Sequence, residues 1–87
     1  MQPTSHLDTR LDSFRATIIL RALITDLHTQ AQVLDNDIQE EQRRTGVFDA
    51  ADVTYSTLAR HLNARRDNLL ATIRLLESQL GTTDRAA

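Results

Sequence analysis

The sequence predicts an all-α fold: an antiparallel hairpin of two long helices that pack like a coiled coil. Its 87 residues include only two glycines and one proline. A small all-β domain needs turn residues roughly every 8–12 positions, so this composition excludes one. Apolar residues instead recur three and four positions apart along most of the chain, as on the face of a helix. The two glycines, Gly46 and Gly81, stand where these periodic segments stop, which is where a glycine commonly follows the last helical residue.

The first helix is predicted over residues 6–45. Ser5 and Asp8 have the spacing of a capping box at its start. Arg43 and Arg44 place positive charge in its last turn, where the helix dipole favours cations. A helix of this length extends roughly 60 Å.

A short turn over 46–49 then leads to a second helix predicted over 50–80, followed by a flexible tail over 81–87. Asp49 is the expected N-cap of this helix, and Phe48 is expected to pack on Val53 as a hydrophobic staple. Two helices joined by so short a turn must lie antiparallel.

Matching apolar seams on the two helices predict the core. Arg65 interrupts the seam of the second helix. The antiparallel register pairs Leu34 with Leu62 and Leu27 with Leu69. The seam residues are Leu20, Leu23, Leu27, Ala31, Leu34 and Ile38 in the first helix, and Tyr55, Leu58, Leu62, Leu69, Ile73, Leu76 and Leu80 in the second.

A separate apolar stripe runs along the first half of the first helix, nearly opposite the core seam at about 100° per residue. We call it the N-terminal stripe; its residues are Leu7, Leu11, Phe14, Ile18 and Ala22. The second helix covers one side of the first and is too short to reach its beginning. Such an exposed apolar patch is typical of an interaction site. We expect a second copy of the chain to cover it, giving a dimer and a four-helix bundle, or a helical protein partner. The alternative is that residues 5–17 fray or fold back in a monomer.

The charges suggest a weaker candidate site. Ten arginines and no lysine oppose twelve acidic residues, for a net charge of −2, which argues against general binding to nucleic acid or anionic membranes. Arg60 is expected to pair with Asp35 or Asp37 on the facing helix, as on a solvated helix surface. The alternative is a basic patch for phosphate or an acidic partner, made of Arg43, Arg44, Arg60, Arg65 and Arg66.

The hairpin tip is another candidate. Val47 and Phe48 place two apolar side chains there, and an exposed Phe48 would make the tip a docking point.

Nothing in the sequence indicates catalysis, a cofactor or a metal. There is no cysteine, the three histidines lie too far apart to form a helical ligand pair, and no glycine-rich phosphate loop is present. The start of the chain lacks the features of a signal peptide, and no apolar stretch is long enough to span a bilayer. The expectation is therefore a non-enzymatic cytoplasmic protein.

The predicted hairpin resembles, in shape alone, small secretion and flagellar chaperones, type VII secretion substrates and a small RNA-binding dimer of helical hairpins. The Trp-x-Gly of the type VII substrates is absent from the tip. Shape does not decide function, so three hypotheses stand. The preferred one is an oligomerisation or adaptor module that uses the N-terminal stripe. The alternatives are an RNA-binding dimer that uses the arginines, and an export-type chaperone for a partner's helix.

Overall fold

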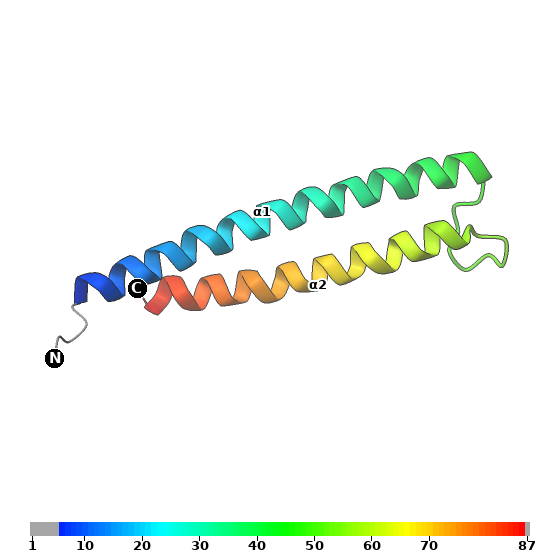
Figure 1. Cartoon of the computed structure of the whole chain (residues 1–87). Coiled ribbons are helices and arrows are strands. Elements are labelled where there is room, and N and C mark those ends of the chain that lie inside the picture. Colours follow the sequence, from blue (N-terminus) through cyan, green and yellow to red (C-terminus); the bar gives the residue numbers. More distant parts are fainter. Residues whose placement is uncertain (1–5, 87) are drawn as a thin grey trace.

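The chain folds into a hairpin of two long antiparallel helices in a computed structural model (Figure 1). The structure describes the backbone of residues 6–86 and the side chains of residues 10–82. Helix α1 spans His6–Thr45 and helix α2 spans Thr57–Ala86. No strand occurs within this backbone, so the predicted all-α helical hairpin is confirmed.

Helix α1 ends where the sequence predicts. Gly46 has a φ of 74°, in the left-handed region, and its N–H donates to the carbonyl of Gln42 at 2.8 Å. This is the bond that closes an αL cap. The expected capping box at the other end, Ser5 with Asp8, lies outside the described side chains.

The connection between the helices is longer than predicted. It runs over 46–56 rather than 46–49, and α2 begins at Thr57 rather than at residue 50. The N-cap of α2 is Ser56, whose Oγ accepts the N–H of Ala59 at 3.1 Å.

The two aspartates expected to start the second helix form turns instead. The side chain of Asp49 accepts the N–H of Ala51 at 2.9 Å, and that of Asp52 accepts the N–H of Thr54 at 2.8 Å. Each is an Asx turn, in which the carboxylate bonds to the backbone two residues on. Such local bonds compete with helix formation, so the predicted cap was wrong.

The predicted staple is also wrong. Phe48 is 61% exposed and Val53 is 94% exposed. Because Val53 lies in the loop rather than in the first turn of a helix, its side chain has no surface to pack against.

The longer loop changes the register of the hairpin. Asp35 meets Arg66, with Nη1 to Oδ1 at 2.8 Å, and not Arg60 as expected. Arg66, rather than Arg65, therefore stands in the seam between the helices. The buried apolar residues are Ile24, Ala31, Leu34 and Ile38 of α1, Ala59 and Ile73 of α2, and Tyr55 of the loop. Two predicted core residues, Leu23 and Leu58, are 43% and 55% exposed.

Helix α2 continues past the predicted stop at residue 80. Gly81 lies inside the helix without a positive φ, and the helix continues to Ala86, so 81–86 is not the predicted flexible tail. A helical glycine costs only about 1 kcal/mol relative to alanine, which does not force a helix to end. Even with this extension, the first turns of α1 project beyond the end of α2 (Figure 1).

Candidate functional site

The N-terminal stripe lies exposed on α1. Phe14, Ile18 and Leu11 are 63%, 50% and 43% exposed, and Ala22 is exposed as well. Ile24, on the other side of the same helix, is 8% exposed. The first half of α1 therefore has two apolar sides, and α2 covers only one. The side chain of Leu7 lies outside the described residues.

The stripe has a defined end. Beyond Ala22 the same side of α1 is mainly polar, although Val33 near it is 52% exposed, and four polar residues along it are all exposed. They are Thr25, Thr29, Gln32 and Asn36. A partner that needs an apolar surface would therefore contact the first half of α1 and not its whole length.

The exposed apolar surface is wider than the sequence suggested. Ile19 is 67% exposed and Leu23 is 43% exposed, between the stripe and the side that packs on α2. The seam spacing predicts Leu23 in the core. Ile24 is buried in its place, whereas the predicted seam residues Ala31, Leu34 and Ile38 are buried as expected, so the packed side is rotated only at this point of α1.

The hairpin tip presents one large apolar side chain. Phe48 is exposed, whereas Val47 is half-buried and its N–H donates to Oγ1 of Thr45 at 3.3 Å. The predicted tip residues therefore do not share one exposed surface.

A buried carboxylate joins the helices near the loop. Glu41 of α1 is 8% exposed. Nε and Nη2 of Arg44 donate to its two oxygens, each at 2.8 Å, and the hydroxyl of Ser56 donates to Oε2. The Arg44 hydrogen bonds, followed by that of Ser56, lower the pKa of Glu41 to about 2. Sequence reasoning missed this cluster, although the Glu41–Arg44 spacing of three is a recognised helical ion-pair spacing.

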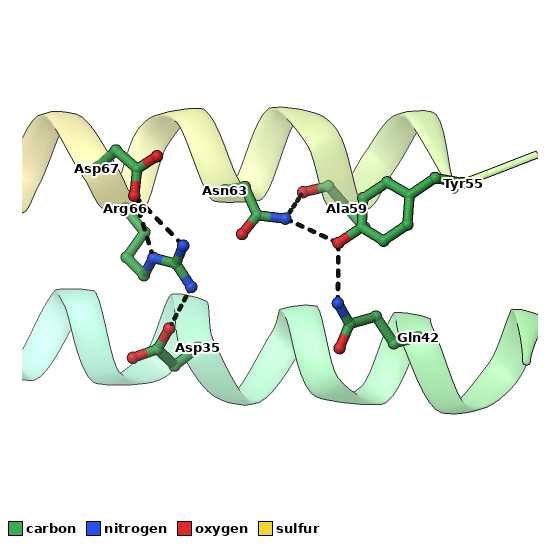
Figure 2. A network of polar contacts seen from close by, with 7 residues as sticks. All are labelled: Asp35, Gln42, Tyr55, Ala59, Asn63, Arg66 and Asp67. Carbon is green, nitrogen blue, oxygen red and sulfur yellow. Dashed lines mark hydrogen bonds and ion pairs between the residues drawn. The ribbon is translucent and has the colours of Figure 1, made fainter. Parts of the chain in front are cut away.

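A second polar group lies next to it, centred on a buried phenol (Figure 2). The hydroxyl oxygen of Tyr55 accepts Nε2 of Gln42 at 2.9 Å and Nδ2 of Asn63 at 2.8 Å. The same nitrogen of Asn63 also donates to the carbonyl of Ala59 at 2.8 Å. These bonds link α1, the loop and α2, and they satisfy a phenol that is only 4% exposed.

Arg66 makes the third link between the helices (Figure 2). Its guanidinium donates to Asp35 of α1 at 2.8 Å and to Asp67 of α2 at 3.2 Å. The hydrogen bond to Asp35 makes the largest contribution to raising the pKa of Arg66, and the bond to Asp67 adds to it. Since the side chain is 26% exposed, its stem packs in the seam while the charged end meets the carboxylates.

The five arginines of the suggested basic patch do not gather into one open cationic surface. Arg44 is held by Glu41, and Arg66 by two aspartates. Arg60 donates to the backbone carbonyl of Asp52 at 2.9 Å, and its guanidinium carbon lies 5.3 Å from the centre of the Tyr55 ring. The remaining two, Arg43 and Arg65, are exposed on different helices.

The described surface also carries open, shallow hollows of about 250, 310 and 330 Å³. A shallow hollow of about 250 Å³ lies between the helices, lined in part by Leu34, Asp37 and Arg65. Within the described part of the chain, no group of three or more histidine or acidic side chains is placed to hold a metal ion. Neither helix, as far as it is described, has a stretch long and apolar enough to cross a bilayer.

We compared the chain with protein-family models, with curated proteins and with solved structures, and none of them matches it.

Proposed function

We propose that this protein is a non-enzymatic interaction module that associates through the N-terminal stripe. The observation that carries the proposal is the exposure of Leu11, Phe14 and Ile18, at 43%, 63% and 50%, on the side of α1 away from α2. Monomeric proteins rarely leave such a contiguous apolar surface in water.

Burial of these side chains would supply the driving force. Full burial of one large apolar side chain contributes about 1.5–3 kcal/mol relative to leaving it exposed. The stripe can obtain this only from another molecule, because α2 already packs on the other side of α1. A second copy related by a two-fold axis would bury both stripes at once and produce a four-helix assembly.

Binding of a different helical protein, as in the chaperone hypothesis, would use the same stripe. Binding of RNA through the arginines has less support, because Arg44 and Arg66 already meet carboxylates at 2.8 Å. Aromatic residues for base stacking are also scarce, with one tyrosine, two phenylalanines and no tryptophan.

Sedimentation velocity over a range of micromolar concentrations tests self-association. The wild-type chain should form a larger species as concentration rises. Leu11→Asp combined with Phe14→Asp should abolish it while circular dichroism shows most of the helicity retained. Val53→Asp is the matched control, because Val53 is 94% exposed but lies in the loop.

Site-specific photo-crosslinking covers the case of a different partner. A crosslinker at the exposed Ala22 should capture a protein in the source cells, and the Leu11→Asp, Phe14→Asp double variant should abolish capture. A chain that stays monomeric, and gives no stripe-dependent crosslink, would overturn the proposal.

A further inference from the structure

We propose that the N-terminal stripe of one chain docks into a groove between α1 and α2 of a second copy of this chain. This inference rests on the proposed function and names the surface that covers the stripe. The stripe residues Leu11, Phe14 and Ile18, which are 43%, 63% and 50% exposed, make the contact.

The groove runs along one side of the seam between the helices. It consists of two open hollows of about 250 and 330 Å³ that share Asp37 as a lining residue. On α1 it extends from Gln30 to Arg44, which is roughly 20 Å of helix. Two of its large apolar residues, Val33 and Leu58, are 52% and 55% exposed. The apolar lining is Val33, Leu34, Leu58, Leu62 and Leu69.

The opposite side of the seam is closed by hydrogen bonds between the helices and the loop (Figure 2). Arg66 donates to Asp35 at 2.8 Å, and Gln42 donates to the hydroxyl of Tyr55 at 2.9 Å. At about 100° per residue, Asp35 and Gln42 lie about 140–160° from Asp37 around α1. The groove therefore lies on the side of the hairpin that these bonds leave open.

The walls of the groove are charged. Asp37 and Glu40 are exposed on the α1 wall, and Arg65 is exposed on the α2 wall. Within the described part of the chain, these three side chains make no hydrogen bond or ion pair. Glu41 and Arg44 also line the groove but pair with each other at 2.8 Å. The α1 wall therefore presents two carboxylates that can meet cations of a partner.

The stripe carries the complementary charge. Arg10 and Arg15 are both exposed, one on each flank, and each lies about 40° from the nearest stripe residue, Phe14 and Leu11 respectively. Whichever way the docked helix runs, one of the two arginines therefore lies over the α1 wall and its carboxylates. Asp12 lies about 160° from Phe14, on the side that faces away from the groove.

These charges favour the groove of a second copy over its stripe. Two stripes in contact would bring four arginines into one interface, whereas the groove offers the carboxylates of Asp37 and Glu40. The lengths also match, because the stripe from Leu11 to Ala22 extends roughly 17 Å along α1. The centres of the stripe and the groove are about 20 residues, or roughly 30 Å, apart on α1. A docked chain therefore keeps its own groove open to a further copy, and association runs head to tail.

Mixing two variants tests this contact by sedimentation velocity. The stripe variant carries Leu11→Asp with Phe14→Asp, and the groove variant carries Val33→Asp with Leu58→Asp. All four positions are exposed, so circular dichroism should show both variants folded. Each variant alone should be monomeric, and an equimolar mixture should form a 1:1 complex, because one chain supplies the groove and the other the stripe. Leu75→Asp is the matched control and should associate as the wild type does, because Leu75 is 72% exposed but does not line the groove.

Charge exchange in the otherwise wild-type chain tests the contact without replacing an apolar residue. Asp37→Arg with Glu40→Arg should raise the Kd of self-association roughly 3- to 10-fold. Adding Arg10→Glu with Arg15→Glu to the same chain should restore the Kd. Arg65→Glu alone should lower the Kd, because it removes the cation on the α2 wall.

The outcomes separate this contact from the proposed function. A groove variant that still dimerises, or charge changes in the groove that leave the Kd unaltered, would overturn the groove as the partner of the stripe and leave the proposed function intact. A chain that stays monomeric, yet gives stripe-dependent crosslinks to another protein, would do the same. The loss of both self-association and crosslinking would overturn the proposed function itself.

Discussion

The hydroxyl of Ser56, at the start of α2, donates a hydrogen bond to the carboxylate of Glu41 in α1. The same oxygen accepts the N–H of Ala59, so one side chain both caps α2 and ties it to the facing helix. Arg44 also pairs with this carboxylate, at 2.8 Å to each oxygen. The closed end of the hairpin is therefore held by a polar joint as well as by apolar packing.

Loss of the Ser56 hydroxyl should weaken the hairpin. Ser56→Ala removes the N-cap and the bond to Glu41, and should lower the free energy of unfolding by about 1–2 kcal/mol in urea denaturation. Thr57→Ala, one residue later on the exposed surface, is the control and should change it by less than about 0.5 kcal/mol. Aspartate caps helices as well as serine does, but Ser56→Asp places a second carboxylate beside Glu41. The Ser56→Asp variant should therefore also be less stable than the wild type. An equally stable variant would contradict a stabilising hydrogen bond between Ser56 and Glu41.

Acid should weaken the same joint. The pKa of Glu41 falls from its ordinary 4.5 to about 2 in the folded chain, so the folded state binds this proton less readily than the unfolded state does. The stabilisation is therefore complete above about pH 5 and is lost as the pH falls from 4.5 toward 2.

Denaturation of the wild type and of Glu41→Gln at each pH measures this contribution. The pKa of Asp52 is also lowered, by its hydrogen bonds with Thr54, so the stability of both proteins falls further as Asp52 is protonated in acid. The difference between the two proteins isolates Glu41, and it should shrink as the pH approaches 2. A constant difference would show that the charge of Glu41 does not stabilise the fold.

The two glycines should respond to alanine in opposite directions. A Cβ added at either one would meet nothing within 4 Å, so their backbone conformations alone separate them. Gly46 has a φ of 74°, and alanine there should cost about 1 kcal/mol of stability. Gly81 is helical, and alanine there should add about 0.5–1 kcal/mol. Thermal unfolding followed by circular dichroism reports both, and destabilisation by Gly81→Ala would show that α2 ends before this residue.

Neighbouring arginines in α2 should differ in their contribution to stability. Arg66→Ala removes a partly buried guanidinium that bridges to Asp35 at 2.8 Å, and should cost about 1 kcal/mol. Arg65→Ala, at an exposed position, should cost less than about 0.5 kcal/mol. A double-mutant cycle with Asp35→Ala should give a coupling energy of about 0.5–1 kcal/mol for Arg66 and close to zero for Arg65. Equal coupling for both arginines would contradict the register of the hairpin.

The helical content and the end of α1 could be predicted because each follows from a local signal. Apolar periodicity continues without a breaker up to Gly46, whose left-handed φ of 74° ends the helix. The start of α2 could not be predicted in the same way. Asp49, Asp52 and Ser56 are all good N-cap residues, and only the hydrogen bonds that each makes distinguish a turn from a cap.

The register between the two helices depends on which of these residues caps α2. Once the loop reaches Ser56, the facing pairs shift, and Arg66 rather than Arg65 enters the seam. The seam spacing tolerates such a shift because leucine, isoleucine and alanine recur at neighbouring positions, so Ile24 can replace Leu23 in the core. The N-terminal stripe could be predicted as a pattern, because its residues lie on the side of α1 opposite the seam that packs on α2. The sequence alone does not show how far its side chains are exposed.

Tyr55 makes the closed end of the hairpin separately observable. It is the only tyrosine, and there is no tryptophan, so the intrinsic fluorescence above 300 nm comes from this one buried phenol. Circular dichroism at 222 nm instead averages over both helices. If the projecting start of α1 unwinds before the joint opens, the two signals will give different melting curves. If the hairpin melts as one unit, the two curves will coincide. The unlabelled chain therefore already carries the probe that distinguishes stepwise unfolding from cooperative unfolding.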